Sequence, residues 1–461
     1  IGDAAEAIKR ARREMENEFA SHLTESYSRG YTQMFRCQML TELEEVIEFK
    51  AAHDNRERQM AITNTWRQRM QGVQRDVGMW QRLLRLHSMV LRPVLDLETW
   101  IKFINLCRKA DQMNIAKQAI RTLVSDEAKY MDETLRGDPE TLPPMLVQQA
   151  HEYARLKEMN RQKGLVGDFS KYGEESDQAL DISIRQSQQP ALVYAYLKYQ
   201  WADNRRRDAF QGLDTFTTEY AAQLRFDVQN PHTFIDQLDA ATSLSTIGTH
   251  SGDIERVRLL ARFFFKKAEW LTSIQQNANL VQEAKSKAAL GADDSHYLPQ
   301  RFDRRGSVSR RSGRSMSISV AGFATGATNG AAEVTEADRD AEFLSRMKVG
   351  PINEVILKSY QAATVLDRKW YKAWHSLALR HYYETQKIDS ELSIVPENVI
   401  EKHVVPAVHG FFRAIQLSKS DTTLQDTLRL LTVWFNYSQH SSVAQAVLDG
   451  FNTVSIRTWL Q

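Results

Sequence analysis

Proline, cysteine and long apolar runs are all scarce in this chain of 461 residues, which contains 10 prolines and 2 cysteines. Because proline disrupts a helix interior, its scarcity favours long helices. Cys37 and Cys107 lie within apolar helical patterns, as reduced core thiols of an intracellular protein do, so we expect neither a disulfide framework nor a redox pair. No segment approaches the roughly 18 consecutive apolar residues of a membrane-spanning helix, and we expect no direct membrane span.

The motifs of common catalytic, nucleotide and metal sites are also missing. The sequence contains no glycine-rich dinucleotide loop, Walker lysine loop, protein-kinase catalytic triplet, HExxH or paired CxxC. His375 and His381 share one predicted helix, but a spacing of six does not place two ligands on one face. We therefore predict that this chain holds no catalytic residue, no metal and no cofactor of an enzymatic reaction.

Net charge is small and unevenly distributed. Residues 301–319 contain six arginines against one acid, Asp303, and carry +5, whereas the whole chain carries +2. The remaining residues therefore sum to −3. Because no basic surplus is left outside this stretch, we predict that the chain does not bind nucleic acid.

One apolar spacing occurs twice, more than 300 residues apart. The two copies are Trp100, Phe103, Cys107, Ala116 and Ile120, and Leu428, Leu431, Phe435, Ala444 and Leu448. In each copy the first three residues share one helix face, and the small residue lets a second helix approach closely. This spacing is typical of tetratricopeptide hairpins, which bury their apolar faces only by stacking. We predict an all-α fold, a tetratricopeptide- or HEAT-like solenoid of helical hairpins.

A further hairpin is predicted to begin at Pro190. Its residues Tyr194, Leu197 and Trp201 keep the first part of the spacing. Ala209 and Leu213 then follow one residue early, which predicts a shorter turn. No alternating run of β-branched residues is long enough to predict a strand.

Composition divides the chain into three parts. Residues 291–336 are rich in Gly, Ser, Arg, Ala and Thr and nearly free of large apolar residues, which predicts a disordered insertion between solenoid parts 1–290 and 337–461. Ser307 follows arginines at positions −3 and −2, and Ser317 follows one at −3, a pattern that basophilic kinases recognise. Both serines are candidate phosphorylation sites, and an inert solvated linker is the alternative.

Six segments resemble the FAT region of target-of-rapamycin kinases. They are ESYSRGY (25–31), LTELEEV (40–46), WYKAWH (370–375), PAVHGFFR (406–413), LQDTLRLL (424–431) and TWLQ (458–461). They stand in the family's order and span nearly the whole chain except residues 291–336. The resemblance implies an intracellular Ser/Thr protein kinase of the phosphatidylinositol-3-kinase-related group.

The resemblance also implies how this part of such a kinase works. In that family the FAT region is a helical, C-shaped solenoid that clamps the kinase domain, and this chain would be its non-catalytic C-terminal part. The rapamycin-binding bundle and the kinase domain, with ATP and Mg, would follow Gln461. Expected partners are these domains, the subunits of target-of-rapamycin complexes and a second copy in a dimeric parent. The expected location is cytoplasmic, peripheral on vacuolar or lysosomal membranes through partners.

The family further implies a basic pocket for an inositol polyphosphate such as inositol hexakisphosphate. Lys102 and Lys198 on first helices and Lys117 on a second helix are the candidates, although position 202 is Ala202 rather than a basic residue. Solvated surface lysines are the alternative. For the whole chain, the alternative function is a stand-alone peptide-binding adaptor, which should line its concave face with polar residues, whereas a clamp should expose apolar patches.

Overall fold

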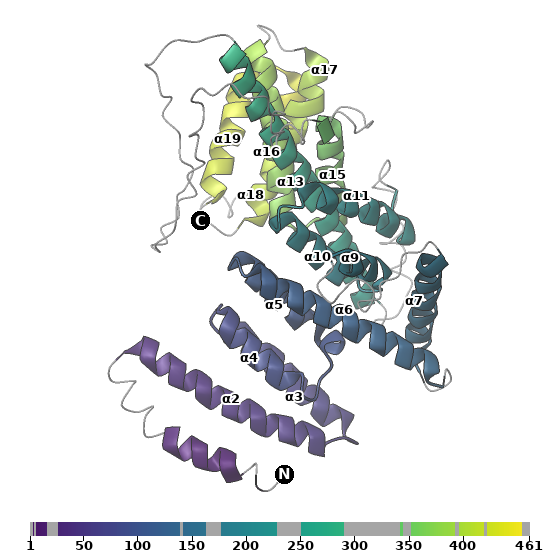
Figure 1. Cartoon of the computed structure of the whole chain (residues 1–461). Helices are drawn as coiled ribbons and strands as arrows, with labels where there is room; N and C mark the ends of the chain where they lie inside the picture. Colours follow the sequence, from purple (N-terminus) through teal and green to yellow (C-terminus); the bar gives the residue numbers. More distant parts are fainter. Residues whose placement is uncertain are drawn as a thin grey trace, which may run out of the picture. The chain divides into compact units, whose positions relative to one another are not determined.

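The computed structural model describes ten stretches of the chain. They are Asp3, 6–15, 26–138, 142–162, 177–227, 250–289, 342–343, 352–391, 396–418 and 422–453. Every regular element within these stretches is a helix (Figure 1). The predicted all-α fold is therefore confirmed. The predicted insertion at 291–336, with Ser307 and Ser317, lies outside the described residues and stays a prediction.

The chain divides into two compact units, Ile1–Asp227 with Asp236–Phe263, and Val228–Ile235 with Phe264–Gln461. Unit 1 contains α2 (Tyr27–Ala51), α3 (Arg56–Gly72), α4 (Val77–His87), the 3-10 helix η1 (Pro93–Asp96), α5 (Leu97–Lys109), α6 (Met113–Arg136), α7 (Pro144–Gln162), α9 (Asp177–Gln186), α10 (Pro190–Ala202) and α11 (Arg206–Gln223). Unit 2 contains α15 (Ile352–Leu366), α16 (Tyr371–Glu391), α17 (Glu397–Val399), the π-helix η2 (Ile400–Val404), α18 (Val405–Leu417), α19 (Thr422–Tyr437) and α20 (Ser441–Thr453). The helix α13 (His250–Ala289) contributes to both units.

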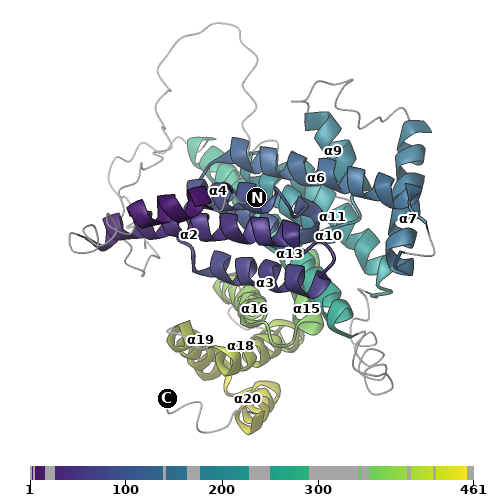
Figure 2. The ribbon, with the colours of Figure 1, turned by 90° about the horizontal axis from the view of Figure 1, so that it is seen from below.

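Helices of unit 1 pack mainly on their neighbours in sequence. Contacts join α2 to α3 and α4, α4 to α5, α5 to α6, and α10 to α5, α6 and α11; the first of these pairs lies side by side in Figure 2. The side chains of Leu83, Ile104 and Ile120 are completely buried between these helices. Such serial packing is the arrangement expected when each hairpin buries its apolar face on the next.

The hairpin α5–α6 has the register predicted from the sequence. Phe103, Cys107, Ala116 and Ile120 are at most 2% exposed, and burial raises the pKa of the Cys107 thiol to about 12. Asp111 adopts a left-handed conformation, φ 58°, and the amide of Gln112 donates to the carbonyl of Cys107 at 2.9 Å. This C-terminal cap turns the chain back so that the small side chain of Ala116 faces α5.

The hairpin α10–α11 corrects the sequence prediction. Its connection has three residues, as in α5–α6, and repeats the same cap, with Asn204 at φ 62° and Arg205 donating to the Gln200 carbonyl at 3.0 Å. The predicted shorter turn is therefore wrong. The counterparts of Trp100, Phe103 and Cys107 are Val193, Tyr196 and Gln200, all buried and one residue earlier than the apolar pattern indicated. The pattern failed because two of these three positions carry polar groups.

In unit 2 the helix α18 lies at the centre of the core. It packs against α16, α19, α20 and η2, and it buries Val408, Phe411 and Phe412 almost completely. Its glycine Gly410 lies against Ala378 of α16, where an added Cβ would come within 2.8 Å of the Ala378 Cβ. The small residues of two helices therefore set their close approach.

The closing hairpin α19–α20 has the predicted helices but buries the opposite face. Leu428, Phe435 and Leu448 are 55%, 73% and 58% exposed. The residues buried instead on α19 and α20 are Leu430, Val433, Tyr437, Val443, Ala446 and Val447. The reason is that α18 covers the inner face of both helices, which leaves Ala444 only half-buried.

Candidate functional site

Four fully buried carboxylates tie helices of the same unit together. Glu42, Asp96 and Glu127 in unit 1 and Asp426 in unit 2 are each at most 4% exposed. A buried charge is costly unless its partners compensate it, so each of these groups constrains the helices that supply its partners. We call these four residues the buried ties.

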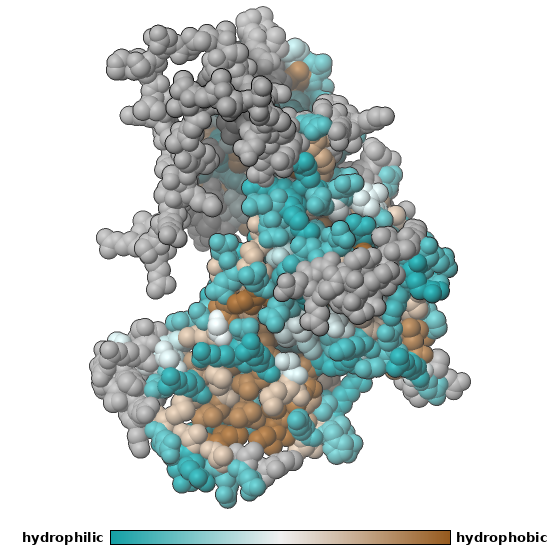
Figure 3. Space-filling model, viewed as in Figure 1, coloured by the Kyte–Doolittle hydropathy of each residue, from teal (hydrophilic) through white to brown (hydrophobic). Residues whose placement is uncertain are grey.

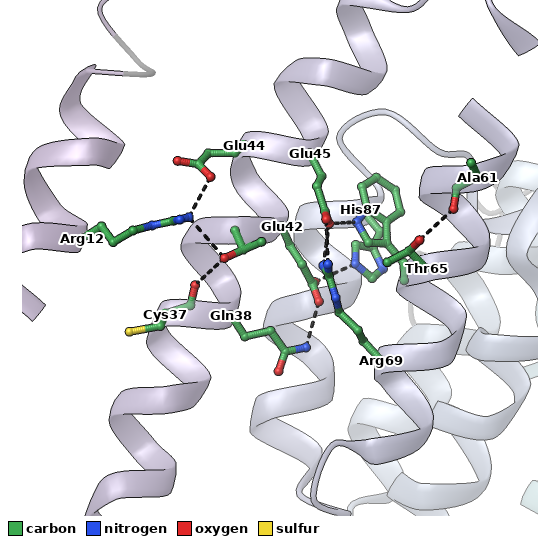
Figure 4. A network of polar contacts seen from close by, with 12 residues as sticks. Arg12, Cys37, Gln38, Glu42, Glu44, Glu45, Ala61, Thr65, Arg69 and His87 are labelled. Carbon is green, nitrogen blue, oxygen red and sulfur yellow. Dashed lines mark hydrogen bonds and ion pairs between the residues drawn. The ribbon is translucent and has the colours of Figure 1, made fainter. Parts of the chain in front are cut away.

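The tie at Glu42 joins α2 to α4. Its carboxylate accepts from His87 Nε2 at 2.8 Å and from Gln38 Nε2 at 2.8 Å (Figure 4). The His87 ring in turn stacks on Trp66 of α3, with ring centroids 4.3 Å apart and planes inclined by 6°. Three helices therefore meet around one acid.

A second carboxylate beside this tie connects α2 to α3. Glu45 accepts from Trp66 Nε1 at 2.8 Å and, through both oxygens, from Arg69 at 2.6 and 2.8 Å. The bond to Glu45 raises the pKa of the Arg69 guanidinium. Bidentate pairing fixes direction as well as distance, so the angle between the two helices is constrained.

The ties at Asp96 and Glu127 form hydrogen bonds at the turns before α5 and α10. Asp96 accepts from Arg67 Nε at 2.8 Å and from Thr99 Oγ1 at 3.0 Å, which connects α3 to the start of α5. Glu127 of α6 accepts from the Gln188 amide at 2.9 Å and from Ser187 Oγ at 2.7 Å, just before α10. Burial raises the pKa of the Glu127 carboxyl. In the first case Arg67 of α3 bonds to an acid in the turn before α5, and in the second Glu127 of α6 bonds to the turn before α10.

The tie at Asp426 joins α19 to α16. One carboxylate oxygen accepts from His375 Nδ1 at 2.8 Å and from the Tyr371 hydroxyl at 3.2 Å, and the other accepts from Arg429 at 3.0 Å. These four residues come from the segments 370–375 and 424–431, two of those that carried the family resemblance. Their shared buried contact gives a structural reason for both motifs.

The three predicted ligand lysines each have their own partner. Lys102 pairs with Glu98 at 2.7 Å, and Lys117 pairs with Asp177 at 2.5 Å. Lys198 Nζ lies 4.3 Å from the centroid of the Tyr194 ring. The lysines come from α5, α6 and α10, which pack together, but two of the three charges are already compensated by carboxylates.

Sequence reasoning missed a fourth cation in this region. Arg108 of α5 is half-buried, and its Nε finds no hydrogen-bond partner among the described residues. Burial lowers its pKa, and Tyr194, beneath Lys198, is the group that opposes this shift. Arg108 and Lys198 therefore share Tyr194 as a neighbour. The sequence signal was the position of Arg108 directly after the core residue Cys107, which predicts an edge of the buried face.

Two surfaces expose apolar side chains. On the first, Leu424, Leu428 and Phe435 of α19 and Leu448 of α20 are 55–73% exposed; we call these four residues the outer apolar face. On the second, apolar side chains gather over α2 and α4 of unit 1 (Figure 3). Contiguous exposed apolar surface of this kind is typical of binding surfaces.

Within the described stretches, no group of three His, Cys, Asp or Glu side chains is arranged to hold a metal ion. Across those same residues, no helix is both long enough and apolar enough to span a membrane.

Comparisons with known proteins agree with the resemblance. The FAT domain family model matches residues 1–295 and 339–432. The serine/threonine-protein kinase tor1 of Schizosaccharomyces pombe is 27% identical to this chain, and the serine/threonine-protein kinase TOR2 of Saccharomyces cerevisiae is 28% identical to it. Each match covers 98% of this chain and 14% of the relative's own length. The serine/threonine-protein kinase TOR of Arabidopsis thaliana is 28% identical over 99% of this chain and 13% of its own length.

The chain thus spans a small fraction of the relatives that it matches, 13–14% of their length. The match extends into both helical units and includes five of the six segments on which the resemblance was based; the sixth, TWLQ (458–461), lies beyond its end at residue 432. The chain belongs to the FAT domain family and is similar to the corresponding region of target-of-rapamycin kinases.

Proposed function

We propose that this chain is a non-catalytic helical scaffold of a target-of-rapamycin-type Ser/Thr protein kinase. It positions the kinase domain of the same protein and supports complex assembly in growth signalling. The observation that carries the proposal is the set of buried ties, Glu42, Asp96, Glu127 and Asp426, each bonded to a neighbouring helix or turn.

The physical argument is that the buried ties make each helical unit stiff. Separating two tied helices would leave a buried carboxylate without its partner, which costs about 3–5 kcal/mol. Alternative packings within a unit are therefore disfavoured, and a surface presented by one helix keeps its orientation relative to its neighbours. A support that positions another domain needs this property, whereas purely apolar packing tolerates small rotations more readily.

The relatives' names support the choice of parent protein, because each is called a serine/threonine-protein kinase and is much longer than this chain. The proposed partners are the kinase domain, the rapamycin-binding bundle, the subunits of target-of-rapamycin complexes and a second copy of the parent. The proposed location is cytoplasmic, with peripheral attachment to vacuolar or lysosomal membranes through partners. The exposed apolar surfaces support a clamp over a stand-alone peptide-binding adaptor.

The test uses the full-length parent kinase with His375→Ala, which removes one partner of Asp426. We expect faster hydrogen exchange in α19 and a several-fold loss of phosphotransfer to a protein substrate. The matched control is His409→Ala, which truncates an exposed histidine of the adjacent helix α18. Faster exchange in α19 with unchanged phosphotransfer would refute the scaffold role, because the support would have loosened without consequence.

We also propose an inositol polyphosphate pocket in unit 1 that involves Lys102, Lys117 and Lys198. The half-buried Arg108 supports this proposal, because a desolvated guanidinium nitrogen without an acceptor favours a bound anion. Lys198 and Arg108 would bind directly through their shared neighbourhood at Tyr194. Lys102 and Lys117 would exchange a carboxylate partner for phosphate.

Inositol hexakisphosphate should raise the melting temperature of the chain. A ligand that binds only the folded state, at ~100 times its Kd, adds about 2.7 kcal/mol. Arg108→Gln with Lys198→Gln should abolish the shift, whereas Lys109→Gln, at an exposed position of the same helix, should leave it intact. An equal rise of the melting temperature in the unmodified chain, the double variant and Lys109→Gln would show nonspecific binding. No rise in the unmodified chain at low salt would refute the pocket.

A further inference from the structure

The outer apolar face has no role in the functions proposed above for the buried ties and the basic residues. Leu424, Leu428 and Phe435 recur on α19 at spacings of four and seven, which places them on one side of the helix. Leu448 belongs to α20, which contacts α19. All four are more than half exposed, although α18 buries the inner side of both helices. A helix with apolar residues on two sides needs two neighbours.

Unit 1 shows what packs on the hairpin that carries the same spacing elsewhere in this chain. The copy on α5–α6 buries Phe103, Cys107 and Ile120 almost completely. The first helix of a later hairpin, α10, packs against both α5 and α6. In unit 1 the hairpin that carries this spacing is therefore packed against another hairpin that follows along the chain.

The charge distribution of α19 and α20 narrows the choice of partner. Among their exposed positions in the described stretch 422–453, Asp449 is the only charged residue. The one arginine of the two helices, Arg429, is mostly buried against Asp426. An anionic partner, such as nucleic acid or an acidic membrane surface, would find no cation here. The chemistry fits a partner that is apolar and uncharged.

We infer that the outer apolar face docks a helical hairpin of the same repeat type, supplied by the parent chain after α20. In a solenoid each repeat contacts its sequence neighbours, so the hairpin that follows is the expected occupant. The relatives supply the necessary length, since this chain spans only 13–14% of them. The inference deepens the proposed scaffold by naming the surface through which α19 and α20 are continued.

The test places a photoreactive phenylalanine analogue at Leu428 or Phe435 of the full-length parent. Mass spectrometry should locate cross-links within the same molecule, in a helical segment C-terminal to residue 461. The matched control places the analogue at Asn436, which is exposed but points about 100° away from Phe435 on α19. We expect few or no cross-links to that segment from the control position.

Three results would overturn the inference. Cross-links between isotopically distinguishable copies would make the face a contact between identical chains. Cross-links to another polypeptide would make it a subunit interface. An absence of cross-links at both positions would mean that the face stays exposed to solvent. None of these results bears on phosphotransfer, so a failure here is distinguishable from a failure of the scaffold proposal.

A second measurement compares the 461-residue chain with the full-length parent. Phe435→Glu should leave the melting temperature of the chain alone unchanged, because the side chain is 73% exposed. In the parent the same change should make hydrogen exchange in α19 about tenfold faster, because the covering hairpin is displaced. Asn436→Glu should have no effect in either protein. If Phe435→Glu changed hydrogen exchange in α19 equally in the 461-residue chain and in the parent, the inference would be contradicted.

Discussion

At the scale of single residues, buried charge distinguishes the helix contacts of this protein from ordinary apolar packing. Glu42 and His87 are separated by 45 residues in sequence, and both are almost completely inaccessible to solvent. A pair of this kind adds little net stability, because desolvation offsets most of the attraction. What it adds is selectivity, since every other register leaves the acid without a partner.

His87→Ala should therefore be strongly destabilising. The substitution leaves Glu42 buried with only Gln38 as a donor, and it also removes the ring that stacks on Trp66. We expect the free energy of unfolding in urea to fall by about 3–5 kcal/mol. The control is His53→Ala, whose side chain is 76% exposed beside Asp54 and which should change stability by less than about 1 kcal/mol. Equal effects of the two substitutions would show that the pair is not a tie.

A second histidine pair gives the protein a defined pH dependence. His381 Nδ1 of α16 lies 3.3 Å from His403 Nδ1 of η2, and His381 is 8% exposed. Burial, followed by the neighbouring His403, lowers the pKa of His381 to about 4. Burial also lowers the pKa of His403, with Glu384 opposing the shift and Lys402 adding to it. The folded state therefore favours neutral rings.

The sign of the effect follows from linkage. An unfolded histidine titrates near pH 6.5, so the unfolded state binds the proton first as pH falls. Stability from His381 is fully present above pH 6.5 and is lost between pH 6.5 and about 4, by at most about 3 kcal/mol. His381→Asn should reduce this slope in unfolding curves measured from pH 7.5 to 4.5. Identical slopes in the two proteins would contradict the assignment.

At the scale of helices, sequence periodicity predicted which elements form but not always which face they bury. The predicted α5–α6 register was correct for Phe103, Cys107, Ala116 and Ile120, which are all buried. On α10 the pattern followed Tyr194, Leu197 and Trp201, whereas Tyr196 and Gln200 are the buried counterparts because they bond to Asp181 of α9. A polar residue satisfied by a distant partner cannot be recognised from spacing.

For the closing hairpin α19–α20, the prediction of the buried face was wrong for a different reason. Leu428 and Phe435 define one apolar face of α19, and Leu430, Val433 and Tyr437 define another. Spacing cannot tell which of two apolar faces has a neighbour, because that depends on where α18 lies. The buried ties were missed for the same reason, since Asp426 finds His375 and Tyr371 only across the folded unit. The lysines were proposed from the family resemblance, which did not extend to Arg108.

The contact between α18 and α20 depends on a glycine. An added Cβ at Gly450 would overlap the ring of Phe412, which is itself 2% exposed. Gly450→Ala should therefore lower the free energy of unfolding by about 1–3 kcal/mol, and Phe412→Leu in the same protein should recover part of the loss. The matched control is Gly72→Ala in α3, where nothing lies within 4 Å of the added Cβ and stability should be unchanged or slightly higher. Similar effects at both glycines would place the helix contact elsewhere.

At the scale of the whole chain, the FAT domain model leaves unmatched a stretch that belongs to unit 2 and lies between α13 and α15 in sequence. The FAT domain model matches up to residue 295 and resumes at 339. The composition of residues 291–336, with its surplus of arginine and lack of large apolar residues, predicts that this stretch contributes no core. Phosphorylation at Ser307 would add about −1.5 to −2 charge there and leave the helical packing unchanged.

Deleting residues 295–335 should consequently leave the melting temperature within a few degrees of that of the complete chain. Limited proteolysis of the intact protein should cut first between Arg301 and Arg314, where basic cleavage sites are dense, and the two products should remain helical. The control removes residues 144–162, the helix α7, whose Ala150 and Tyr153 pack on Met131 of α6. That deletion should lower the melting temperature clearly, because it exposes a buried cluster. If both deletions destabilised the protein equally, residues 295–335 would belong to the core, and the division of the chain into two solenoid parts would be wrong.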